Sequence, residues 1–282
     1  MDGKWRFMAT WVLLSFWLVA FAAAQLGAGP AAAGIQTLVL VGWVAVHASL
    51  AYGWKGFGAF FAISLAVAFA MEASSIHTGF PFGFYSHSDF MGPKLLGVPP
   101  PVALGYVFLG YLAWSLGKLI MRGRPTGLAP LYAVTTPIAA TFILAGYDLG
   151  YDPIGSTVLG HWAFRYPSGY FGVPLTNFLG WLLTGWVALQ LFALVERRFT
   201  AAAPAFTRGF WLQPCLIWGV SALQYPMMFA RAPDGLATVG ARSFVIADVY
   251  ESAVIVSLLT MLFAALAAAG RLAAMNFKER MP

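Results

Sequence analysis

The sequence predicts an all-α integral membrane protein with about eight transmembrane helices. Of its 282 residues, 60% are hydrophobic and 9% are charged, whereas a soluble domain carries about 25% charged residues. The apolar residues fall into long uncharged blocks, and a bilayer needs about 20 of them for each helical span. The net charge of +6 comes from Lys and Arg that stand singly between these blocks. That pattern is typical of membrane topology and not of a nucleic-acid partner.

The apolar blocks divide residues 1–282 into spans of one polytopic membrane domain. The first block mimics a signal peptide, because Lys4 and Arg6 precede it and Ala22 to Ala24 offers a cleavage site. It is also long enough to cross a bilayer, and we favour an uncleaved helix. In chain order the spans are expected at about 7–26, 35–52, 57–76, 102–121, 131–147, 176–195, 210–229 and 249–275.

The basic residues support eight spans with both termini in the cytoplasm, since cytoplasmic loops carry an excess of Lys and Arg. The outer side then receives four basic residues, namely Lys94, Arg165, Arg231 and Arg242. The inner side receives the other 12 of the 16, namely Lys4, Arg6, Lys55, Lys118, Arg122, Arg124, Arg197, Arg198, Arg208, Arg271, Lys278 and Arg280.

The acidic residues gather on the opposite side. Seven of the ten fall in or beside outer loops, namely Glu72, Asp89, Asp148, Asp152, Asp234, Asp248 and Glu251. Ordinary solvation explains acids in an outer loop. Glu72 and Asp148, however, lie just inside predicted spans, where a charge is costly and function is the default hypothesis. We therefore expect an active site near the outer leaflet.

Two outer loops share one pattern at identical spacing. The first copy contains Gly97-Val98-Pro99, Gly105-Tyr106 and Gly110-Tyr111, and the second contains Gly172-Val173-Pro174, Gly180-Trp181 and Gly185-Trp186. Glu72 stands 25 residues before the first copy and Asp148 stands 24 before the second. We interpret spans three–four and five–six as a parallel repeat whose two acids face one cavity. A chance match in a chain rich in Gly and aromatic residues is the alternative.

Three outer segments are candidates for chemistry. Residues 72–85 are too apolar for a solvated loop, so we expect them to fold over the bundle as a cap. In residues 146–172, Asp148 and Asp152 share a face if the helix persists, although Pro153 disfavours helix at Asp152. Asp248 and Glu251 begin the last span, where the helix macrodipole also favours acids.

At these loops the sequence resembles the CruF-type carotenoid hydratases. This family of integral-membrane carotenoid biosynthesis proteins includes the bisanhydrobacterioruberin hydratases. The resemblance covers roughly residues 60–260. It rests on Glu72 with Thr78-Gly79 and the run 81–85, on Gly92-Pro93, on Asp152-Pro153 and on the run 169–181. One departure is Trp162-Ala163-Phe164, where the family leads us to expect a Trp-x-Trp element.

The resemblance implies a hydratase of the carotenoid 1,2 type in a bacterial or archaeal cytoplasmic membrane. Such enzymes add water to the terminal double bond of an acyclic, lycopene-like or γ-carotene-like end group, with no cofactor. The substrate would come from the lipid bilayer, and other carotenoid biosynthesis enzymes are expected contacts. The sequence itself has four His, too few for the His boxes of di-iron hydroxylases, and no dinucleotide or phosphate-binding motif. We expect no metal.

Alkene hydration needs a protonated acid, a stabilised carbocation and a guided water. Burial favours the neutral, proton-bearing form of a carboxyl, so Glu72, Asp148 and Asp152 are the candidate acids and bases, with Asp152 and Glu72 as the leading pair. His77 would relay a proton or hold water, or be a hydrogen-bonded residue of the cap. Aromatic faces stabilise cations. The expected substrate and water contacts are Tyr85, Asn177, Phe82, Trp162, Tyr166, Tyr170, Phe171, Trp181, Arg165 and Glu251.

Three rival functions use similar features. A transporter or lipid carrier suits buried acids and broken helices, but the acids gather at one surface and not at the midplane. A retinal photoreceptor requires a Lys inside a span, and Lys4, Lys55, Lys94, Lys118 and Lys278 all fall at span ends or in loops. A membrane isoprenoid cyclase or isomerase would use the same acids and aromatics, and only product analysis separates it from a hydratase.

Overall fold

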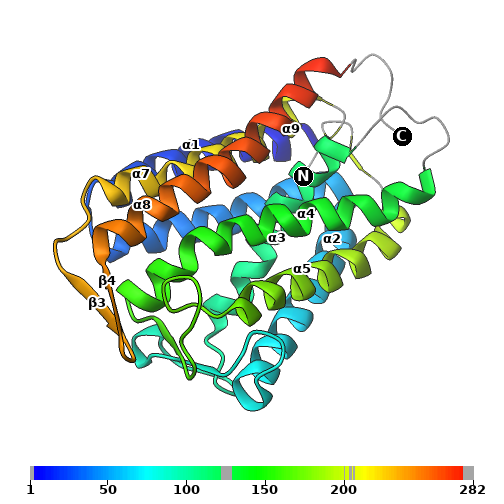
Figure 1. Cartoon of the computed structure of the whole chain (residues 1–282). Coiled ribbons are helices and arrows are strands. Elements are labelled where there is room, and N and C mark those ends of the chain that lie inside the picture. The colour runs from blue at the N-terminus through cyan, green and yellow to red at the C-terminus, as the bar shows by residue number, and fades with distance from the viewer. Residues whose placement is uncertain (1–2, 122–128, 200, 203–204, 206, 276–282) are drawn as a thin grey trace.

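The computed structural model describes residues 3–121, 129–199, 201–202, 205 and 207–275, which form a bundle of long helices (Figure 1). Arg122, Arg124, Lys278 and Arg280 of the topology prediction lie outside these residues. The helices are α1 (Gly3–Gln25), α2 (Pro30–Thr78), α3 (Pro100–Met121), α4 (Ala129–Asp152), α5 (Leu175–Val195), α6 (Arg208–Ala222), α7 (Gln224–Phe229), α8 (Ile246–Ser257) and α9 (Phe263–Ala274).

Five helices in the described residues are long and apolar enough to cross a membrane. They are Gly3–Gln25, Ala31–Thr78, Pro100–Met121, Leu175–Arg198 and Ile246–Ala274. With helix as the dominant structure throughout, these spans confirm the prediction of an all-α membrane protein. The predicted spans at 131–147 and 210–229 are also helical, in α4 and in α6 with α7, although neither is among the five.

Several helices bend or change pitch where the sequence contains a special residue. The predicted second and third spans form one element, α2, with a break at Gly53, whose φ of 66° and ψ of 171° are not helical. Pro153 does not disturb Asp152, which keeps helical angles of −57° and −43°. The helix therefore persists through Asp152, and Pro153 is accepted as the first residue of a new turn. That turn is the π-helical segment η2 (Pro153–Val158).

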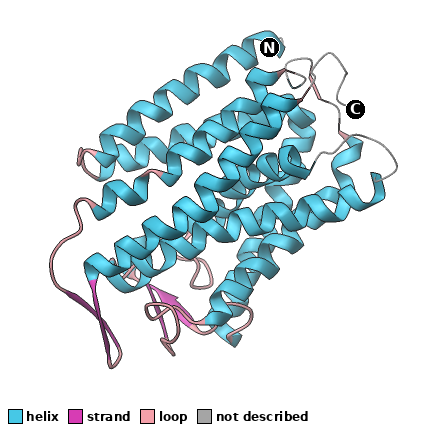
Figure 2. Ribbon diagram, turned by 45° about the horizontal axis from the view of Figure 1, so that its top comes forward, coloured by secondary structure: helices cyan, strands magenta, loops and turns pink. Residues whose placement is uncertain are grey.

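The outer loops contain short strands that the sequence did not predict. Strand β1 (Tyr85–His87) pairs antiparallel with β2 (Trp162–Phe164), with Ser86 opposite Ala163. Strand β3 (Leu236–Val239) forms a hairpin with β4 (Arg242–Val245). Figure 2 places both pairs at the same end of the bundle. The first pair ties together the loops that follow α2 and η2.

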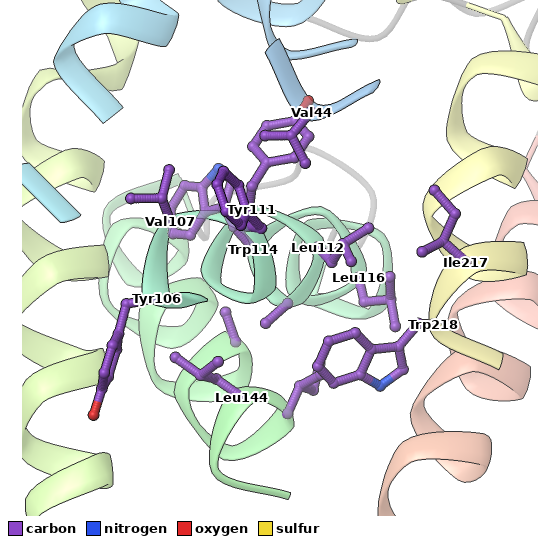
Figure 3. Close-up of a cluster of buried hydrophobic side chains, with 14 of the residues drawn as sticks. Val44, Tyr106, Val107, Tyr111, Leu112, Trp114, Leu116, Leu144, Ile217 and Trp218 are labelled. Atoms are coloured by element: carbon purple, nitrogen blue, oxygen red, sulfur yellow. The ribbon is translucent and has the colours of Figure 1, made fainter. Parts of the chain in front are cut away.

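The core lies between α2, α3, α4 and α6 (Figure 3). Its fully buried side chains include Tyr111, Trp114, Leu116 and Trp218. His47 is buried among them: one ring nitrogen is 2.7 Å from the Tyr111 hydroxyl and the other is 3.0 Å from the Phe210 carbonyl oxygen. Tyr106 lies on a different side of α3 from Trp218 in the same view. This side of α3 faces α5, where the candidate site is found.

The start of α1, the start of α6 and the end of α9 lie together, at the end of the bundle away from the strands. Gly209 at the start of α6 packs near Phe7 of α1. The Arg208 guanidinium donates to the carbonyl oxygen of Met275, beyond the end of α9, over 2.7 Å. Figure 1 shows this end opposite the end that carries β3 and β4. We call the end with the strands the loop end.

Candidate active site

The two copies of the sequence repeat fold into the same turn. In the first, the backbone amides and carbonyls of Leu95 and Val98 exchange two hydrogen bonds of 2.9 Å. In the second, Tyr170 and Val173 do the same at 2.9 and 3.2 Å. The residue before each Gly has a positive φ, 48° at Leu96 and 49° at Phe171. Each turn leads through a Pro into a helix, α3 or α5.

The same repeat brings its aromatic residues face to face. Tyr106 and Trp181, which occupy matching positions after the two turns, stack with ring centroids 4.2 Å apart and planes 14° apart. The stack joins α3 to α5 beside the three carboxyls of the predicted site.

Glu72 is buried near the end of α2, with 4% of its surface exposed. It accepts hydrogen bonds from two phenols. The Tyr85 hydroxyl donates to Oε2 in a short contact, and the Tyr106 hydroxyl donates to Oε1 over 3.4 Å. Burial and the neighbouring Glu72 raise the pKa of Tyr85 well above its usual range. The Tyr85 phenol is therefore a neutral donor to the carboxyl.

Asp148 and Asp152 lie on one face of α4, as the i, i+4 spacing predicted, with 1% and 4% of their surfaces exposed. Their carboxyls are within hydrogen-bonding distance of each other. The amide of Asn177, near the start of α5, donates to both: to Asp148 over 3.3 Å and to Asp152 in a shorter contact. Two carboxyls can hydrogen-bond only while one is protonated. A hydrogen bond between Asp148 and Asp152 therefore requires that one of the two carries a proton.

The three carboxyls form one cluster with neutral partners. Glu72 is close enough to interact electrostatically with both Asp148 and Asp152. Among the groups of the described residues that act on the cluster in this way, none is a Lys or Arg. Their hydrogen-bond partners are phenols, an amide and one another. A buried carboxylate without a cation is costly, so at least part of the cluster stays protonated.

Aromatic rings surround this cluster. The Phe82 ring lies 6.4 Å from those of Tyr85 and Trp181. Tyr147 stacks on Tyr151 at 5.8 Å, and Tyr151 lies 6.2 Å from Trp162. The packing is close, since a Cβ added to Gly180 would collide with Phe82 and one added to Gly155 would collide with Trp162.

Four of the predicted site residues lie away from the cluster. His77 and Glu251 are exposed. Arg165 is also exposed, and its guanidinium lies over the rings of Phe84 and Tyr166, at 5.8 and 5.5 Å, instead of beside an acid. Tyr166 is 64% exposed. Tyr170 and Phe171 are partly buried in the second turn, where Phe171 packs 5.6 Å from Phe244.

The structure adds three residues that sequence reasoning missed, Tyr106, Tyr147 and Tyr151. The sequence contained a signal that could have identified Tyr106, because this residue follows Gly105 in the first copy of the repeat. Tyr147 and Tyr151 flank the two Asp residues in the sequence, but a Tyr beside an acid is common in a chain with 11 Tyr. No group of three or more His, Cys, Asp or Glu in the described residues is arranged to hold a metal ion.

Two cavities are lined by elements that carry or follow residues of the cluster. One, of about 280 Å³, lies between α4 and α5 and is lined by Ile138, Thr141, Phe142, Leu182, Leu183 and Trp186. Thr141 is two helical turns from Asp148, on the same face of α4. The other cavity, of about 510 Å³, lies at the loop end between η2, β2 and the β3–β4 hairpin.

Comparison with known proteins identifies the family to which this chain belongs. A family model described as carotenoid biosynthesis protein matches residues 33–230. The bisanhydrobacterioruberin hydratase of Haloarcula japonica is 33% identical over 124 residues. This match covers 44% of the chain and 40% of that protein. No solved structure matches the chain.

Proposed function

Because the chain belongs to the carotenoid biosynthesis protein family, we propose that it is a carotenoid hydratase. In this proposal it adds water to the terminal C=C bond of an acyclic, lycopene-like or γ-carotene-like end group and forms a tertiary alcohol. The observation that carries the proposal is the buried cluster of three carboxyls with only neutral hydrogen-bond partners. The named relative, a hydratase, supports the reaction class.

The Asp148–Asp152 pair is the proton donor in this proposal. Two like charges at hydrogen-bonding distance cannot both persist in a buried site, so the pair keeps one proton. Transfer of this proton to the less substituted carbon of the terminal C=C forms a C–H bond with the π electron pair. The neighbouring carbon becomes a tertiary cation. Asn177 donates to both Asp residues, so it stabilises the negative charge that the pair acquires.

Glu72 is the base. Two phenols donate to it, and donors of this kind favour the charged carboxylate over the acid. In the second step a water oxygen bonds to the tertiary carbon, and Glu72 accepts one proton of that water. The cycle closes when this proton returns to the Asp148–Asp152 pair. General acid and base groups each contribute about 10²–10⁴-fold to a rate when correctly placed.

The rings of Tyr106, Trp181 and Phe82 suit the cation between these steps. A desolvated cation over an aromatic face gains about 2 kcal/mol or more. Trp181 and Tyr106 are already held by their mutual stacking. They therefore need little rearrangement when charge develops next to them.

The apolar cavity between α4 and α5 suits the polyene chain. It begins two turns along α4 from Asp148 and opens beside side chains such as Phe142, which is 63% exposed. A hydrocarbon chain in the bilayer can lie in it while its end reaches the carboxyls. We also propose that residues 1–282 form a single domain with eight spans and both termini in the cytoplasm. The membrane would be the cytoplasmic membrane of a bacterium or archaeon.

The deciding experiment is expression in cells that make lycopene, grown with ¹⁸O-labelled water, followed by mass analysis of the pigments. We expect a product that has gained one labelled water molecule. A product of unchanged mass would contradict hydration and would indicate an isoprenoid cyclase or isomerase. Unaltered lycopene in cells that accumulate the protein would also contradict the proposal.

A further inference from the structure

The larger cavity has a lining of mixed polarity and lies at the loop end of the molecule. Its volume is about 510 Å³, and its lining includes Ser156, Thr157, Trp162, Ala163 and Thr238. These residues come from three separate segments, η2, β2 and the β3–β4 hairpin (Figure 1). Hydroxyls and backbone groups give it the hydrogen-bonding partners that water needs, and water molecules in proteins typically make two to four such bonds.

Ser156, which lines this cavity, lies one helical turn after Asp152 of the acid pair. The hydroxyl of Ser156 donates to the backbone carbonyl of Asp152 over 2.7 Å. The η2 segment is π-helical, with the Leu159 amide bonded to the Ile154 carbonyl at 2.8 Å. In a π-helix, residues five apart are neighbours along the helix, so Thr157 also lies next to the Asp152 turn.

Aromatic rings link the lining of this cavity to the neighbours of the carboxyls. Trp162 lines the cavity and packs against Gly155. Its ring lies 6.2 Å from the Tyr151 ring and 6.4 Å from the His87 ring. Beyond His87, at 5.2 Å, is the ring of Tyr85, whose hydroxyl binds Glu72. Trp162 thus connects the lining of the cavity to neighbours of both the acid pair and the base.

We propose that this cavity is the water inlet of the active site, so that water arrives from the loop end while the polyene arrives from the lipid side. The inference rests on the proposed hydratase function. The lipid-side cavity is lined by apolar groups with one Thr hydroxyl, whereas the loop-end cavity offers several hydroxyls. Each substrate therefore has a cavity of its own polarity on a different side of the carboxyls.

A closed inlet has a chemical consequence. The tertiary cation that forms after protonation needs a water oxygen to become an alcohol. Without it, the cation loses a proton from a neighbouring carbon to Glu72, and the C–H electron pair forms a C=C bond. The product then has the mass of the substrate, with its double bond at the original or an adjacent position. Blocking the inlet should therefore replace the alcohol by an isomerised product, while protonation of the substrate continues.

The test fills the cavity from an exposed position. Ala163 is the middle residue of β2, is exposed and lines the cavity, so Ala163→Trp adds a large ring at the cavity wall without replacing a buried side chain. Ser86→Trp is the matched control, since Ser86 is the exposed partner of Ala163 on β1 and is not in the cavity lining. Each purified variant is incubated with lycopene in ¹⁸O-labelled water, and both substrate consumption and product masses are measured.

We expect Ala163→Trp to lower the ratio of hydrated to isomerised product by about 100-fold, which is the lower end of what a positioned base and its water contribute. Ser86→Trp should keep the wild-type ratio. If Ala163→Trp forms hydrated product at the wild-type ratio, the proposal that this cavity is the water inlet is wrong, while the proposed hydratase function still stands. If Ala163→Trp consumes no substrate, the test is made with Val239→Trp, which changes the lining of the same cavity from the hairpin. The ratio of hydrated to isomerised product is again the criterion. Wild-type protein that forms no labelled alcohol would instead overturn the proposed function.

Discussion

Two buried charged clusters occupy opposite ends of this helical bundle, and they are built on different principles. At the end away from the strands, Lys118 pairs with Glu196 in a short contact. The Lys118 ammonium also contacts the Tyr52 hydroxyl at 3.1 Å, which accepts from the Trp114 indole at 2.9 Å. At the loop end, three carboxyls have phenols and an amide as partners. The Lys118–Glu196 cluster is neutral because two opposite charges pair. The carboxyl cluster is neutral only when its carboxyls are protonated.

This difference separates a structural role from a chemical one. A paired charge is already satisfied, and removing one partner leaves the other buried and alone. A carboxyl cluster without a cation must hold protons to remain buried, and a held proton is what the proposed acid catalyst needs. Substitutions in each cluster, in the packing around the carboxyls and at His87 test this contrast.

Glu72→Gln and Asp152→Asn should each reduce hydration by about 10²–10⁴-fold, because each removes a proton-transfer group. The thermal midpoint in detergent should not fall, since Gln and Asn keep hydrogen-bonding oxygens and remove a charge that lacks a cation. Product yield and the unfolding midpoint are the two measurements. Glu251→Gln, the same change at an exposed position of the loop end, should retain activity. Full activity in both of the first two variants would remove the catalytic assignment.

Lys118→Met should have the opposite profile. It leaves Glu196 without its cation in a site where only 15% of the Glu196 side chain is exposed, and the loss of one partner of a buried pair costs about 3–5 kcal/mol. We expect a lower unfolding midpoint with unchanged activity per folded molecule. Adding Glu196→Leu should recover most of the stability. A single variant as stable as wild type would show that the pair does not act as a structural contact.

Gly180→Ala tests how tightly the loop-end site is packed. The added methyl would collide with Phe82, whereas at Gly105, the matching position of the repeat, nothing lies within 4 Å. Overpacking costs about 1–3 kcal/mol, so Gly180→Ala should lower both the stability and the hydration rate. Gly105→Ala should be neutral or stabilising, because Gly in a helix is disfavoured against Ala by about 0.5–1 kcal/mol. Equal effects of the two changes would contradict the close contact.

His87 should give the smallest effect, a pH dependence of stability. Burial lowers the pKa of His87 to about 4, from an ordinary value of 6.5. Between these values the unfolded chain binds a proton that the folded protein does not. Stability from the neutral ring is therefore present above pH 6.5 and is lost as the pH falls toward 4. Unfolding midpoints across this range should decline less in His87→Gln than in wild type. Parallel curves would contradict a buried neutral ring.

Much of this architecture could be predicted from the sequence, because it depends on local signals. Apolar runs located the helices, Gly53 fell between two predicted spans, and the spacing of Asp148 and Asp152 placed both on one face. The repeat predicted a shared site for Glu72 and Asp148, and the cluster joins them. These inferences use only the period of the helix and the length of a span.

What the sequence could not supply depends on contacts between distant segments. The pairing of Tyr85–His87 with Trp162–Phe164 joins residues 77 apart at its central pair, Ser86 and Ala163, and three-residue strands have too short a pattern to detect. Arg165 was expected to contact substrate or water, yet it is exposed and its guanidinium lies over Phe84 and Tyr166. The orientation of such a residue depends on which loop packs against it. Tyr106 was missed because its hydroxyl meets Glu72 across two helices.

The stack of Tyr106 on Trp181 has a consequence for the direction of proton movement. If the two matching halves were identical, their facing acids would be equivalent and neither would be a better proton donor than the other. A phenol at one position and an indole at the other removes this equivalence, because Glu72 accepts from the phenol hydroxyl whereas Asp148 accepts from the amide of Asn177. Val102 also stands in the first half where Asn177 stands in the second. In the proposed mechanism, this difference between the two halves gives the proton a source at Asp148 and Asp152 and a destination at Glu72.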